Sequence, residues 1–133
     1  MNRPSVLLVV SAVIYFAAAL VLLFAPGEVL AFAGAPTSIF DRTLLQVIGS
    51  AIFGFAMLNW LNRYARVGGI FGRPIVASNL AHAGTAALLL GKVATHGSFA
   101  TPLAVVLLLY GSLALAFGFT FFVQPATVAD LDN

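Results

Sequence analysis

The sequence contains no cysteine, so disulfide bonds, thiol redox chemistry and thiolate metal sites are all excluded. Charged residues are also scarce, because they make up 8% of the 133 residues, whereas soluble globular domains carry about 25%. Six basic and four acidic side chains cannot cover the surface of a soluble protein of this size. The basic residues do not gather into one patch, so we expect no nucleic-acid partner.

Apolar residues are abundant instead, at 62% of the chain, and they gather in four long stretches without charge. A helix of about 20 apolar residues spans the hydrocarbon core of a bilayer. We therefore predict an all-α fold, an integral membrane bundle of four antiparallel transmembrane helices in a single domain over residues 1–133. A soluble helical protein is the disfavoured alternative, because its helices would each show a polar face. The predicted spans are residues 6–25, 44–61, 74–91 and 102–123.

The segment between the first two spans carries charge, so it cannot lie in the hydrocarbon core. Pro26 and Gly27 end the first span, as is typical of a helix stop. The apolar residues 29–32 favour a short helical turn that rests on the membrane interface. Ser38 and Asp41 have the spacing of a capping box, which predicts that the second helix begins near residues 37–41.

The distribution of basic residues favours one orientation in the membrane. Four spans place both termini and the middle loop on the same side. The basic residues expected on that side are Arg3, Arg63, Arg66 and Arg73, and those on the opposite side are Arg42 and Lys92. The positive-inside rule therefore predicts cytoplasmic termini in a bacterial-type inner membrane. Insertion in both orientations, as in some small transporters, is the alternative.

Five polar side chains inside the spans are the candidate ligand-binding residues. Tyr15, His82 and Tyr110 lie near the centres of their spans, Asn79 lies one turn before His82, and Ser50 lies slightly outward of its span's centre. Unpaired polar groups are costly in hydrocarbon, so we expect Asn79 and His82 to face the bundle interior and to share a polar patch with Tyr15 or Tyr110. We favour simple interhelical hydrogen bonding over a ligand pocket or a proton-handling site, although imidazole titrates near neutral pH.

Arg63 and Arg66 follow the second span and are the candidate contacts for a lipid headgroup, with snorkelling to the interface as the favoured alternative. The spans hold no acidic residue, and no Ser-His-Asp or paired-carboxylate set can be assembled. We therefore predict no catalytic residue, no metal site and no cofactor, and we disfavour an enzyme. Ala104, Gly111 and Gly118 recur at seven-residue spacing, which predicts a close-packed face on the fourth helix.

Two stretches of the sequence resemble a known group of proteins. They are similar to small four-helix bacterial membrane proteins, some of which are grouped as DoxX-like and some of which are uncharacterised. The stretches are "LFAPGEVLAFAG" at 23–34 and "LLQVIGSAIFGFAMLNWLNR" at 44–63, and the later "NLAH" at 79–82 also fits. The resemblance covers about half of the chain. It implies a four-helix bundle and little about function, because such proteins share no common activity.

The sequence supports three hypotheses about function. The first is a non-enzymatic membrane protein that acts as an accessory subunit of a membrane complex or binds a small apolar or lipid-like ligand. The second is a small transporter or channel. The third is an enzyme acting on a lipid or quinone, which would depend on His82 and the two central tyrosines alone. The expected partners are the lipid bilayer and either other membrane subunits or further copies of the chain.

Overall fold

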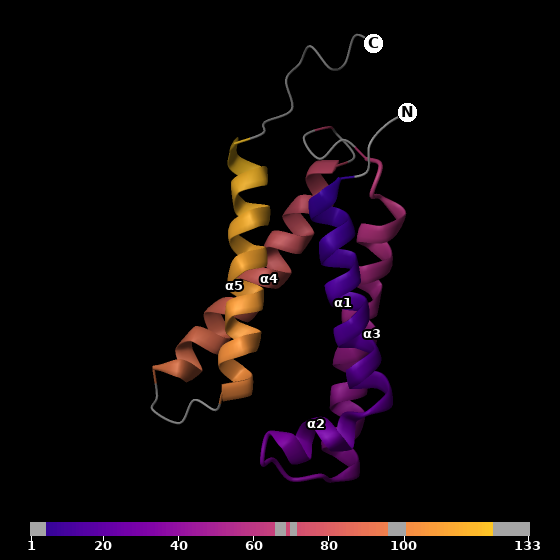
Figure 1. Ribbon diagram of the computed structural model, residues 1–133, viewed down its shortest axis with the longest axis vertical. Helices are drawn as coiled ribbons and strands as arrows, with labels where there is room; N and C mark the ends of the chain where they lie inside the picture. The colour runs from indigo at the N-terminus through magenta and orange to yellow at the C-terminus, as the bar shows by residue number, and fades with distance from the viewer. Residues whose placement is uncertain (1–4, 66–68, 70–71, 96–100, 124–133) are drawn as a thin grey trace. The chain divides into compact units, whose positions relative to one another are not determined.

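The computed structural model describes residues 5–65, 69, 72–95 and 101–123 (Figure 1). The described residues form five α-helices and no strand. The helices are α1 (Val6–Phe24), α2 (Pro26–Phe32), α3 (Ile39–Leu61), α4 (Gly72–Ala94) and α5 (Thr101–Val123). All of them except the seven-residue α2 are long and apolar enough to cross a membrane. The predicted all-α class with four membrane-spanning helices is therefore confirmed.

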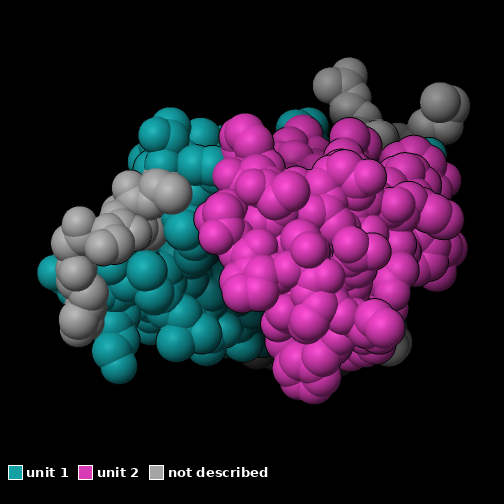
Figure 2. Space-filling model, turned by 90° about the horizontal axis from the view of Figure 1, so that it is seen from below, with its two compact units in different colours: residues 1–7, 64–133 teal, residues 8–63 magenta. Residues whose placement is uncertain are grey.

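The chain divides into two compact units (Figure 2). Residues 8–63, unit 2 in Figure 2, are called here the α1–α3 unit, and residues 1–7 with 64–133, unit 1 in Figure 2, are called the α4–α5 unit. Each unit brings together helices that are neighbours in the sequence, as short connections between membrane helices favour. That the whole chain forms a single transmembrane domain stays a prediction.

The helix ends lie close to the predicted limits and have identifiable causes. Ser38 caps α3, because its Oγ accepts a hydrogen bond from the Asp41 backbone N–H at 3.2 Å and donates one to the Asp41 carboxylate. The helix thus begins at Ile39, within the predicted window and five residues before the uncharged span. Past the end of α2 the chain turns at Gly34, whose φ of 67° is readily adopted only by glycine.

Helices α1 and α3 pack antiparallel in the α1–α3 unit. Near one end, the Asn59 side chain contacts Ser11, and near the other end the Gln46 Nε2 donates a hydrogen bond to the Leu23 carbonyl at 3.0 Å. That carbonyl is one of the last four of α1, which no residue of the helix itself can satisfy. Between these ends Gly49 lies so close to α1 that the helices touch almost backbone to backbone. The short α2 packs against α3.

Helices α4 and α5 form the second antiparallel pair. The Leu80 side chain lies 3.5 Å from the position that a Cβ on Gly118 would occupy, which is ordinary van der Waals contact. Around Gly111, in contrast, no atom of the described residues lies within 4 Å of such a Cβ. Within this unit Gly111 therefore makes no close contact with α4, because equal spacing along a helix does not by itself determine which turn faces a neighbour, and the predicted close-packed face stays a prediction at Gly111.

Candidate functional site

The α4–α5 unit brings together two of the predicted site residues. The rings of His82 and Tyr110 meet edge to face, with their centroids 5.5 Å apart and an angle of 70° between the planes. The Tyr110 hydroxyl lies 3.4 Å from the His82 Nε2, and the tautomer of the imidazole decides which of the two donates. This pair joins the two helices by a polar contact in an otherwise apolar environment.

Asn79 lies one turn before His82 and is fully buried. Its Nδ2 donates a hydrogen bond to the Ile75 carbonyl at 2.9 Å, within the same helix. An amide that bonds its own helix is a low-cost way of burying a polar group in hydrocarbon.

Tyr15 and Ser50 lie in the α1–α3 unit. Tyr15 is 2% exposed, and its ring packs edge to face on Phe55 with the centroids 6.2 Å apart. Ser50 is exposed, and its hydroxyl donates to the Val47 carbonyl at 2.7 Å in the same helix. The sharing of one polar patch by Tyr15 and His82 would join the two units, and it stays a prediction.

Of the two predicted headgroup arginines, Arg66 lies outside the described residues. Arg63 follows α3, and its guanidinium carbon lies 4.4 Å from the centre of the Trp60 ring. Its Nη1 also donates a hydrogen bond to the Trp60 carbonyl at 2.7 Å. A cation stacked on an aromatic face and bonded to the backbone is held in one place, so the positive charge at this end of the helix has a defined position.

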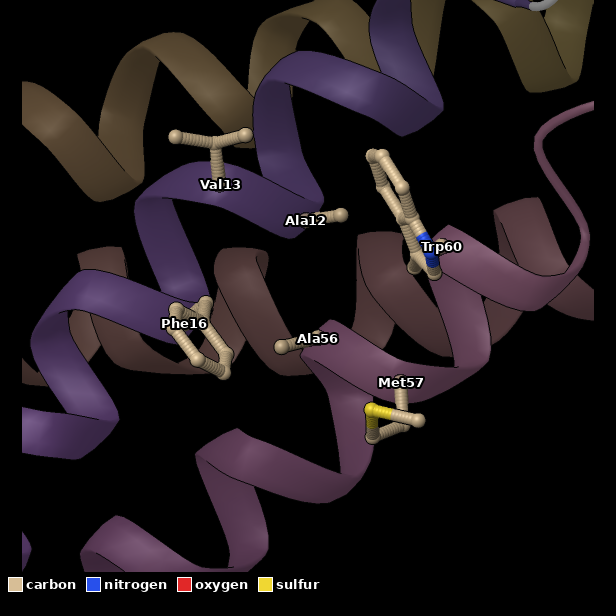
Figure 3. Close-up of a pocket in the computed structure, with 6 residues that line it drawn as sticks. All are labelled: Ala12, Val13, Phe16, Ala56, Met57 and Trp60. Carbon is tan, nitrogen blue, oxygen red and sulfur yellow. The ribbon is translucent and has the colours of Figure 1, made fainter.

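A groove of about 360 Å³ lies between α1 and α3 (Figure 3). Each helix contributes three side chains at positions i, i+1 and i+4, of which the first and last lie on the same helix face. They are Ala12, Val13 and Phe16 from α1, and Ala56, Met57 and Trp60 from α3.

Both alanines of the groove are 2% exposed, so the two helices approach closely at its floor. The four larger side chains form the walls and are 37–58% exposed. Figure 3 shows the rings of Phe16 and Trp60 at opposite ends of the groove. All six side chains are apolar apart from the indole N–H, so the groove suits a hydrocarbon ligand.

A buried polar contact lies directly beside this groove, one residue before Trp60 and one before Ala12. The Asn59 Nδ2 donates a hydrogen bond to the Ser11 Oγ at 2.9 Å, and the Ser11 hydroxyl donates to the Leu8 carbonyl at 3.2 Å. Asn59 and Ser11 are both fully buried. Asn59 is not among the five candidate ligand-binding residues that the sequence indicated.

The sequence does contain a pattern that could have identified this pair. Asn59 lies two residues before the end of α3, and Ser11 lies five residues after the start of α1. In an antiparallel pair, the end of one helix and the start of the other lie at the same membrane face. Two polar residues near that face are therefore natural partners.

In the part of the chain that the structure describes, no three histidine or acidic side chains gather closely enough to hold a metal ion. Comparison with family models, with curated proteins and with solved structures finds no match. The geometry of the two units is therefore the basis for assigning a role.

The contact between His82 and Tyr110 makes a quantitative prediction. In a double-mutant cycle of His82→Ala and Tyr110→Phe, we expect a coupling energy of about 0.6 kcal/mol, the average for polar pairs between membrane helices. Thermal or denaturant unfolding in detergent would measure it. The same cycle with Tyr15→Phe tests whether Tyr15 belongs to the patch. Coupling energies of zero in both cycles would show that His82 takes part in no such patch.

Proposed function

We propose that this multi-pass membrane protein binds one acyl chain of an anionic amphiphile in the groove between α1 and α3, with Arg63 beside the headgroup. The observation that carries the proposal is the apolar groove, which ends at the Trp60 ring on which the Arg63 guanidinium is stacked. An apolar groove that leads to a fixed positive charge matches a ligand with a hydrocarbon tail and an anionic head.

The membrane environment explains why both features are needed. Lipid tails are as apolar as leucine side chains, so burial of hydrocarbon alone gives little preference for a groove over the surrounding bilayer. The preference of a ligand for the groove must therefore come from the shape of the groove and from the charge beside it. The two alanines at the groove floor provide the shape, since larger side chains there would fill it. The arginine provides the charge, at the depth where a headgroup would lie.

The groove can be blocked without changing the buried contact between the helices. Val13 is 58% exposed, and a tryptophan in its place would extend over the groove. We expect Val13→Trp to lose most of the lipid that co-purifies in mild detergent, measured by native mass spectrometry. Val10→Trp is the matched control, because Val10 is 48% exposed on the same helix and lies outside the groove. Equal lipid content in both variants would refute the proposal.

The role of the Arg63 charge is tested separately from that of the groove. Arg63→Gln should lower the content of anionic lipid more than that of neutral lipid, because only an anionic headgroup gains from the guanidinium. An unchanged ratio would remove Arg63 from the site while leaving the groove in place.

The orientation belongs to the same proposal: both termini in the cytoplasm of a bacterial-type inner membrane, supported by the excess of arginine on that side. The lack of natural cysteine makes single-cysteine labelling direct. Ser38→Cys should react with an impermeant thiol reagent outside intact cells, and Gly69→Cys should react only after the cells are opened. The reverse pattern would invert the topology. Further subunits, a homo-oligomer and kinship with DoxX-like proteins stay proposals.

A further inference from the structure

A second hollow in the α1–α3 unit lies at the opposite end of the helices, where α1 ends, α2 follows and α3 begins. It has a volume of about 730 Å³ and has both polar and apolar walls. Its charged side chains are Glu28 from α2 and Arg42 from α3. We call it the Glu28–Arg42 cleft.

Both charged side chains line this cleft, and the Arg42 guanidinium lies against Gly27, the residue before Glu28. The Arg42 guanidinium carbon and Nε each lie 3.5 Å from the position that a Cβ on Gly27 would occupy. The guanidinium therefore packs against the backbone of the residue next to Glu28, in space that any larger side chain at position 27 would take. Gln46 also lines the cleft, and its side chain joins α3 to the last turn of α1 by a hydrogen bond to the Leu23 carbonyl.

The outer walls of the cleft are apolar. Phe24 and Ile39 line it and are 81% and 85% exposed. Phe32 from α2 and Phe40 from α3 are 77% and 74% exposed. Charged residues directly beside exposed aromatic and aliphatic side chains, at the ends of membrane-spanning helices, are typical of the headgroup region of a bilayer.

The balance of charge indicates what kind of headgroup fits. One carboxylate and one guanidinium favour a headgroup that carries both signs over one that is only anionic. A primary ammonium can donate hydrogen bonds to the Glu28 carboxylate, and a phosphate can accept a bidentate pair from Arg42. A quaternary choline ammonium has no hydrogen to donate. We propose that the Glu28–Arg42 cleft binds the phosphoethanolamine headgroup of phosphatidylethanolamine, with the acyl chains along Phe24 and Ile39.

This site does not depend on the groove beside Trp60, because the two hollows share no lining residue. Val13→Trp should leave headgroup preference at the cleft unchanged. Failure of one proposal is therefore distinguishable from failure of the other.

The test uses the full chain in nanodiscs that contain equal amounts of phosphatidylethanolamine and phosphatidylcholine with the same acyl chains. Native mass spectrometry after extraction counts the retained lipid of each kind. The wild type should retain about tenfold more phosphatidylethanolamine than phosphatidylcholine, as expected for hydrogen bonds between charged groups. Glu28→Gln and Arg42→Gln should each abolish most of that preference, and Gly27→Leu should do so without changing any charge.

Three controls make the outcome decisive. Lys92→Gln removes an exposed charge from α4 and should keep the full preference. Arg42→Lys keeps the positive charge and should keep part of the preference, which a variant that fails to fold would not. Equal retention of both lipids by the wild type would overturn the proposal. Displacement of the retained lipid by free phosphoethanolamine at equal concentration would also overturn it, because the ligand would then need no acyl chain.

Discussion

Replacing Gly49 by leucine is expected to force α1 away from α3 and to lower the free energy of unfolding by about 1–3 kcal/mol, the usual cost of overpacking. A Cβ at this position would lie 2.9 Å from the Leu22 Cβ, 3.2 Å from the Leu23 Cγ and 3.3 Å from the Ala19 carbonyl oxygen. The first distance is too short for two carbon atoms, and the third involves backbone that cannot rotate away. The remaining side-chain atoms of leucine would have to enter the same contact.

Gly54→Leu is the matched control for this prediction. It lies on the same helix, and in the part of the chain that the structure describes nothing lies within 4 Å of the position that its Cβ would occupy. Both variants gain the same helix propensity when glycine is replaced, so the difference between them isolates the packing effect. Thermal unfolding in detergent, followed by circular dichroism, measures that difference. If Gly49→Leu unfolds at the same temperature as Gly54→Leu, the close approach of α1 and α3 does not exist.

The comparison of Gly49 with Gly111 shows what sequence periodicity can and cannot predict. Length and lack of charge were sufficient to predict four membrane-spanning helices, because the bilayer imposes both requirements on any helix that crosses it. The identity of the close-packed glycine depends on the rotation of each helix about its axis. The seven-residue spacing around Gly111 does not indicate how the helix is rotated, because the lipid-facing and helix-facing sides of such helices are almost equally apolar.

The candidate site shows the same limit. His82 was expected to share a polar patch with Tyr15 or Tyr110, because polar groups in hydrocarbon seek partners at their own depth, and the structure brings it into contact with Tyr110. The groove could not be predicted in this way. Its six side chains are apolar, and its existence depends on small residues, Ala12 and Ala56, facing each other across the helix pair. Alanine is common throughout the spans, so composition alone does not indicate which two alanines face each other.

The second large effect is expected at the buried contact between Ser11 and Asn59. Ser11→Ala removes the oxygen that accepts a hydrogen bond from the Asn59 Nδ2, while the amide stays fully buried. An amide hydrogen that loses its acceptor in apolar surroundings costs about 1–3 kcal/mol of stability. The hydrogen bond from Ser11 to the Leu8 carbonyl is lost as well, but that carbonyl still accepts within its helix.

Removing both polar groups should be less harmful than removing the serine alone. In Ser11→Ala combined with Asn59→Leu, the amide that lost its acceptor is itself replaced by an apolar side chain of similar size, so most of the stability should return. Unfolding of the wild type, both single variants and the double variant in detergent gives the coupling energy. Asn62→Leu is the matched control, because the Asn62 Nδ2 donates to the Leu58 carbonyl of its own helix. The change in unfolding free energy caused by Asn62→Leu should simply add to that caused by Ser11→Ala. If the changes caused by Asn59→Leu and Ser11→Ala are additive as well, Asn59 and Ser11 do not stabilise each other.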